Sequence, residues 1–166
     1  MAAMDISVAA GMEPFAAQAA GALEFGKARL LAGIEDLSPQ QLAAVPPGFS
    51  NSIASLVVHV AGLEVGMAHG ILGRPLPEDL KAEYLRDRPQ NPIPQPANET
   101  AATLTAKLNR ARGILLPVLE GLKAADLTRE VVMGPNRSLT VRMILVMLAN
   151  HQMQHYGQIQ MIKKFI

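Results

Sequence analysis

The chain has 166 residues, a length typical of a single domain that buries a substantial core. Apolar residues make up 49% of it, only 4% are aromatic and none is Trp, a mix that favours close-packed helices over a β-sandwich. The formal charge of +1 argues against nucleic acid as a partner, and the absence of cysteine excludes disulfides, thiolate nucleophiles and cysteine-based zinc sites.

The first predicted helix covers residues 12–34. Its first turn contains an acidic residue followed by Pro14, a combination typical of helix starts. Residues 38–41, Ser-Pro-Gln-Gln, predict a short capped turn of helix, which Val-Pro-Pro-Gly at 45–48 ends.

A second helix is predicted from residue 50 to about residue 72, with Ser50, Asn51 and Ser52 as alternative N-caps. Residues 73–97 then contain six of the twelve prolines, which excludes a regular helix or a central strand. We expect a long crossing loop here, with at most a short helical piece at 77–84. Such a loop either covers a functional site or serves as a plain surface connector.

The third predicted helix covers residues 98–123, with Pro117 as the point of a kink or a change of direction. A polar connection at 126–137 includes a short β-like run at 130–133. Ser138 or Thr140 then caps a final helix that continues nearly to residue 166. The whole chain, residues 1–166, is therefore expected to form one all-α domain, a four-helix bundle with one long crossover connection.

The most informative motif lies on the last predicted helix, where His151 and His155 form an H-x-x-x-H pair. Residues four apart lie on one face of a helix about one turn apart, which suits two ligands of one metal ion. Apolar residues at helical spacing around both histidines place them on the stripe that faces the bundle interior. Burying two imidazoles there is costly unless they are hydrogen-bonded or bound to metal.

His59 lies on the second predicted helix among small and hydroxyl-bearing residues, as in one wall of a pocket. Together the three histidines would leave a coordination position open, as catalytic metal sites do. His69, about 80° further round the same helix, should miss the site. A core in which the histidines are only hydrogen-bonded to one another or to neighbours remains the alternative. No H-E-x-x-H motif supplies the base of the zinc proteases, and no carboxylate on the histidine stripes supports a di-iron centre.

Two separated segments resemble the DinB-like superfamily of four-helix-bundle proteins: residues 51–59, Asn-Ser-Ile-Ala-Ser-Leu-Val-Val-His, and residues 151–159, His-Gln-Met-Gln-His-Tyr-Gly-Gln-Ile. The approaches to these helices, at 37–42, 46–48 and 138–145, resemble the same family. The chain differs from the family pattern at Asn51, where many members have Trp, and at Tyr156, where Arg often follows the last histidine.

The resemblance implies a four-helix bundle that often assembles as a homodimer. It also implies a divalent metal ion, zinc or nickel, bound by His59, His151 and His155. Related members are transferases or isomerases that use low-molecular-weight thiols such as bacillithiol and mycothiol, and many others are regarded as metal-dependent hydrolases.

These observations predict a metal-dependent enzyme, either a hydrolase or a small-thiol-dependent transferase, that acts on a small molecule. Gln158, Ser52 and Ser55 are the expected acceptors of the ligand N–H groups, or Gln158 orients substrate. The alternative from another class is a non-catalytic ligand-binding or stress-related bundle whose metal is structural or vestigial. The N-terminal segment lacks the features of a secretory signal and no long apolar run predicts a membrane span, so we expect a cytoplasmic location.

Overall fold

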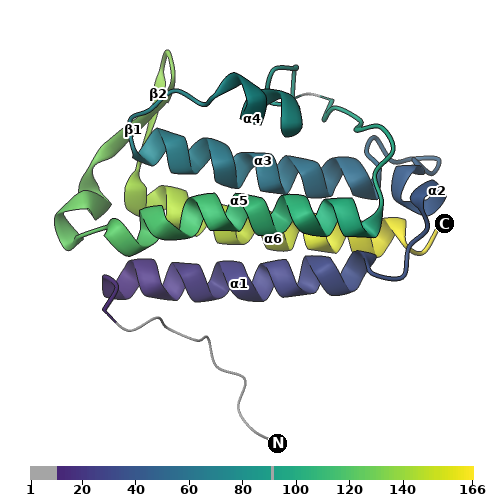
Figure 1. Ribbon diagram of the computed structural model, residues 1–166, viewed down its shortest axis with the longest axis horizontal. Coiled ribbons are helices and arrows are strands. Elements are labelled where there is room, and N and C mark those ends of the chain that lie inside the picture. The colour runs from purple at the N-terminus through teal and green to yellow at the C-terminus, as the bar shows by residue number, and fades with distance from the viewer. Residues whose placement is uncertain (1–10, 91) are drawn as a thin grey trace, which may run out of the picture.

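Four long helices dominate the computed structural model, which describes residues 11–90 and 92–166 (Figure 1). They have 19 to 22 residues each: α1 (Pro14–Ile34), α3 (Ile53–Ile71), α5 (Ala101–Gly121) and α6 (Val141–Ile162). The prediction of an all-α four-helix bundle is confirmed, with each long helix within a few residues of its predicted range.

The helices are arranged in the order α1, α5, α3, α6 around the bundle, because α1 packs on α5 and α6, and α3 packs on the same two helices. Two of the three connections therefore run across the bundle diagonal. The third, residues 72–100, joins the neighbours α3 and α5 by the long crossover that the prolines predicted.

Side-chain caps explain where the long helices begin. Ser52 is the N-cap of α3 and accepts a hydrogen bond from the N–H of Ser55, so it is the one used among the three predicted caps. Thr140 caps α6 in the same way through the N–H of Met143. The helix α5 continues through Pro117 to Gly121.

Short elements occupy the connections. The capped turn predicted at 38–41 is α2 (Pro39–Ala43), and the short piece expected in the crossover is α4 (Glu78–Glu83). A 3₁₀ helix (Ala124–Thr128) precedes the antiparallel hairpin of β1 (Glu130–Gly134) and β2 (Arg137–Thr140), which pairs Val131 with Leu139. Figure 1 shows α4 outside the four long helices, on the side of α3 that faces away from α1.

The core is divided into two apolar clusters by a layer of polar side chains, one from each long helix. Arg112 of α5 donates to both carboxylate oxygens of Glu64 on α3, at 2.9 and 3.1 Å, and to Glu24 of α1 at 2.7 Å. Gln152 of α6 donates to the same Glu64 at 2.5 Å. Glu64, Arg112 and Gln152 are buried, and the two clusters lie on either side of them along the bundle axis.

Among the described helices, α3 alone has the length and apolar composition to cross a membrane. Its most apolar window is 72% buried within the bundle, where it packs on α5 and α6. Its hydrophobicity is that of a core helix.

Candidate metal centre

His151 and His155 project from one face of α6, as their spacing of four residues predicts. His155 is buried, with 6% of its surface exposed, and His151 is half-buried. Apolar neighbours on the same stripe, such as Leu148 and Ile159, are buried in the core and so fix the rotation of α6. Both rings therefore point toward α3.

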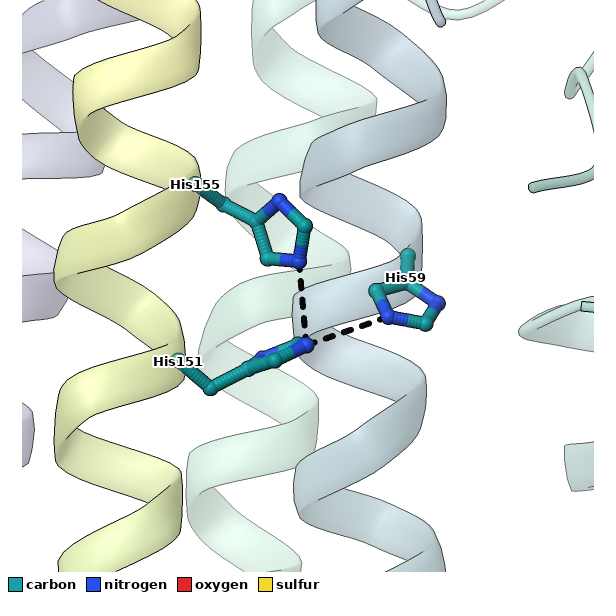
Figure 2. A group of neighbouring side chains, drawn as sticks. All are labelled: His59, His151 and His155. Atoms are coloured by element: carbon teal, nitrogen blue, oxygen red, sulfur yellow. Dashed lines mark hydrogen bonds between the residues drawn. The ribbon is translucent and has the colours of Figure 1, made fainter. Parts of the chain in front are cut away.

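His59 meets this pair from α3, which runs antiparallel to α6. Figure 2 shows the three rings turned toward one another across the gap between the two helices. The Nε2 atom of His151 lies 3.0 Å from Nε2 of His155 and 3.1 Å from Nε2 of His59. One ligand atom from each ring lies within 4.8 Å of the others, so the structure brings together the three histidines that the sequence singled out.

Glutamine side chains contact the far nitrogens of two of these rings. Nδ1 of His155 lies 2.6 Å from Oε1 of Gln158, and Nδ1 of His59 lies 3.2 Å from Oε1 of Gln90. An amide oxygen only accepts, so each Nδ1 carries the hydrogen and each Nε2 presents a lone pair. Two acceptor nitrogens thus face Nε2 of His151, whose single possible N–H cannot bond well to both.

This arrangement fits a bound cation. Tetrahedral zinc with nitrogen ligands at about 2.0–2.1 Å places those nitrogens about 3.3 Å apart. The two Nε2 separations, 3.0 and 3.1 Å, are close to that value. Three imidazoles that each offer a lone pair leave a fourth coordination position for water or substrate.

Burial keeps the three imidazoles neutral. It lowers the pKa of His59 to about 4, although the contact with Gln90 opposes this, and it lowers the pKa of His151 to about 3; the positive charge of Arg86 acts in the same direction as burial on both rings. The pKa of His155 is also lowered by burial, although the contact with Gln158 opposes this. Neutral imidazole is the form that binds metal, so at pH 7 no proton has to be displaced from the rings.

Of the other predicted site residues, Gln158 lies at the centre and the two serines do not. Gln158 contacts His155, as its spacing suggested. Ser52 and Ser55 are buried but do not reach His59, because their hydroxyls serve the start of α3: Ser52 Oγ accepts from the N–H of Ser55 and donates to Gln95 at 2.6 Å, and Ser55 Oγ donates to the carbonyl of Ser52. His69 lies outside the three-histidine group.

Two residues of the crossover loop belong to the site and were missed from the sequence. Gln90 contacts His59, and Arg86 donates to the same Gln90 oxygen from Nη1 at 3.2 Å. The loop therefore covers the site, one of the two roles that its length allowed. The signal available in the sequence was Gly62, about one turn after His59, since its lack of a side chain makes room for this loop.

A cavity of about 650 Å³ adjoins the centre on the side of Gln158. Its walls come from the approach to α3 and the second half of α6 and carry no charged side chain: Gly48, Phe49, Ser50, Asn51, Leu56, Gln154, Gly157, Gln158, Met161 and Ile162. The Oδ1 atom of Asn51 is buried there without a hydrogen-bond partner among the described residues. The cavity suits an uncharged, largely apolar group.

A sequence model described as the DinB superfamily matches residues 22–159, which is most of the chain. The chain belongs to the DinB superfamily. A structure titled as the conserved protein of a locus from Enterococcus faecalis shares this fold, with a TM-score of 0.70 and 14% sequence identity over 89% of this chain and 94% of that one. No curated protein matches the sequence. The DinB match includes His59, His151 and His155, the residues of the candidate metal centre.

Proposed function

We propose that this DinB-superfamily protein is a metal-dependent enzyme that acts on a small molecule at the centre formed by His59, His151 and His155. The observation that carries the proposal is the convergence of three Nε2 atoms, two of them held as acceptors by Gln90 and Gln158. A divalent ion held by three neutral imidazoles, zinc or nickel by preference, retains its positive charge, acidifies a bound water or thiol and polarises a carbonyl.

The surroundings of the three histidines favour the transfer of a small thiol over hydrolysis. Within the described residues no carboxylate joins the histidine group, and Glu64, the buried carboxylate on the same helix as His59, is paired with Arg112. Hydrolysis of an amide or ester gains from a positioned general base, whereas a thiol becomes a nucleophile once it is deprotonated. Low-molecular-weight thiols stay reduced in the cytoplasm, so the cytoplasmic location expected from the sequence is part of this proposal.

In this proposal the residues of the chain have separate tasks. Gln90 and Gln158 fix the orientation of the His59 and His155 rings. The crossover loop limits the access of water from one side, and the cavity beside Gln158 receives the apolar part of the substrate.

The metal content of the purified protein tests the proposal. After incubation with zinc or nickel, we expect about one equivalent bound to the wild-type protein and less than about a tenth of an equivalent bound to His151→Ala and His155→Ala. His69→Ala is the matched control and should retain the metal. A wild-type protein that binds no metal would show that the histidines form a hydrogen-bonded core.

Cobalt substitution then distinguishes the reactions. A new absorption band on the addition of a small thiol supports the transferase, because it reports a bond between sulfur and the metal. Turnover of esters or amides without a response to thiols supports the hydrolase. If neither is observed with bound metal, the protein is a binding module with a structural metal.

A further inference from the structure

Arg86 is a half-buried cation at the edge of the histidine centre. Its aliphatic stem crosses α3 at Gly62, where an added Cβ would lie 3.1 Å from Cδ of Arg86 and 3.0 Å from Cβ of Tyr84. Only glycine leaves this space open. Because Gly62 is one turn beyond His59 on α3, the stem leads the guanidinium toward the ring of His59.

The Arg86 guanidinium and the His59 ring contact the same oxygen atom of Gln90. Nη1 of Arg86 donates to Oε1 of Gln90 at 3.2 Å, and the same oxygen is 3.2 Å from Nδ1 of His59. The positive charge also contributes to the lowered pKa of both His59 and His151, so it acts on the centre as a whole.

Among the residues that the structure describes, no carboxylate lies within 4.0 Å of Arg86, whereas the other inward-facing arginine, Arg112, is paired with Glu64 and Glu24. Burial without an acidic partner lowers the pKa of Arg86. Within the part of the chain that the structure describes, Gln90 accepts from one of the five guanidinium N–H groups, and a partly desolvated cation with further donors is a binding site for an anion.

Along α3, the contact with the uncharged cavity comes before His59 and the contact with the Arg86 stem comes after it. Leu56 in the cavity wall, the ligand His59 and Gly62 beneath the Arg86 stem follow one another on successive turns of α3. At 1.5 Å per residue, Leu56 and Gly62 are about 9 Å apart along the helix. A substrate that extends from this cavity past the metal position toward Arg86 would run along this stretch of α3.

We propose that Arg86 binds a carboxylate of the substrate, and that the substrate class is a small monocarboxylate whose remaining part is uncharged. The planar guanidinium matches a carboxylate with two parallel hydrogen bonds, and one unpaired cation balances one negative charge. The proposal rests on the proposed function, because the reacting part of the molecule lies at the metal position between the two ends.

Two small thiols that differ in charge test this assignment in the cobalt-loaded protein. Mercaptoacetate carries a carboxylate and 2-mercaptoethanol does not. In Arg86→Gln, we expect the cobalt–sulfur absorption band to show about 10-fold or more weaker binding of mercaptoacetate, with binding of mercaptoethanol changed by less than about 2-fold. Arg86→Lys should recover part of the loss. Arg88→Gln, an exposed position in the same loop, is the matched control and should behave as wild type.

The metal content of Arg86→Gln separates the two proposals, since it should equal that of the wild type. If Arg86→Gln loses the same affinity for both thiols, or loses affinity for neither, the role of Arg86 is refuted and the proposed metal centre is not.

A second measurement does not need metal. Phenylglyoxal modifies arginine side chains, and mass spectrometry of the metal-free protein measures the modification at each position. Excess mercaptoacetate should slow the modification of Arg86 and leave Arg88 unaffected, while mercaptoethanol at the same ionic strength should protect neither. If no metal binds, this experiment decides the question alone, and equal modification of Arg86 with and without mercaptoacetate refutes the assignment.

Discussion

Gln158 and Gln90 hold the rings of two metal-ligand candidates through their Nδ1 atoms. Fixing a ring by its far nitrogen sets both its tautomer and the direction of its lone pair. The two glutamines come from unrelated places: Gln158 lies three residues beyond His155 on the same helix, whereas Gln90 comes from the crossover loop, 31 residues beyond His59. The first contact depends on helix geometry alone and the second on the path of the loop.

Replacement of Gln158 by alanine should weaken metal binding without unfolding the protein. The His155 ring would lose its Nδ1 acceptor, and the loss of such partners typically lowers metal affinity about 10–100-fold. Competition with a chelator of known zinc affinity measures the change. Gln154→Ala, one turn earlier and exposed, is the matched control. Equal affinities for the two variants would mean that the 2.6 Å contact does not orient the ring.

At the scale of elements, the polar layer of Glu64, Arg112, Gln152 and Glu24 ties all four long helices together. Gln152 adjoins His151 on α6, and Glu64 is five residues beyond His59 on α3. Since Gln152 donates directly to Glu64, this layer sets the register between the two helices that carry the histidines. A slip of either helix would leave a buried charge without its partner.

Removal of one charge from this layer should be strongly destabilising. In Arg112→Met, the carboxylate of Glu64 stays buried without its cation, at a cost of about 3–5 kcal/mol in the free energy of unfolding. Urea unfolding followed by circular dichroism measures it. Arg110→Met on the exposed side of α5 should cost less than about 1 kcal/mol.

The double variant Glu64→Leu/Arg112→Met provides a second comparison for the same layer. It removes both charges at once and should recover most of the loss. A double variant as unstable as Arg112→Met alone would mean that the loss comes from packing and that the charge of Glu64 contributes little.

The helices were predictable from the sequence because apolar spacing and caps are local. Ser52 and Thr140, for example, each accept a backbone N–H three residues further along the chain. The pairing of Glu64 with Arg112 was not predictable, because Arg112 is one of several charged residues on α5 and the two partners are 48 residues apart.

In the candidate site, too, the features that depend on local helix geometry were predictable and the contacts made by the loop were not. Two histidines four residues apart on an interior stripe, with a third on another buried helix, could be grouped in advance. The contributions of Arg86 and Gln90 could not, since they depend on how a proline-rich segment without periodicity crosses α3. That path includes a positive φ of 54° at Leu85, which no propensity favours for leucine.

At the scale of the whole molecule, an apolar stripe remains on the outer face of α6. Met143, Val146, Met153 and Met161 are each 39–51% exposed, and at 100° per residue they lie within about 80° of one another. A single helix stripe that contacts its own copy about a two-fold axis forms a closed dimer. We therefore propose that the homodimer expected from the sequence forms through this face of α6.

Charged substitutions on this stripe should convert the dimer to a monomer. We expect size-exclusion chromatography with light scattering to give twice the mass of 17.7 kDa for the wild type and a single chain mass for Val146→Glu/Met153→Glu. Val132→Glu changes a more exposed apolar residue, 79% accessible on the hairpin, and should leave the dimer intact. A monomeric wild type, or a double variant that stays dimeric, would exclude this face.

The metal-free protein should lose stability in weak acid because of its histidines. The pKa values of about 4 for His59 and about 3 for His151 lie below 6.5, the ordinary histidine pKa, which applies to the unfolded chain. Between those limits the unfolded chain binds protons that the folded chain does not, so the free energy of unfolding falls as the pH drops from about 6.5 toward 4. Above pH 7 these groups are neutral in both states and contribute no slope.

Carboxylates also titrate in acid, so the histidine contribution must be isolated by difference. Urea unfolding of the metal-free wild type and of His59→Gln/His151→Gln, compared over this range, should show the steeper fall in the wild type. Glutamine keeps a polar side chain of similar reach and carries no titrating group. Parallel curves would mean that the two imidazoles titrate in the folded protein as they do in the unfolded chain. In that case the rings would meet a divalent ion as partly protonated groups below pH 7, and the pH dependence of zinc binding would follow a pKa near 6.5.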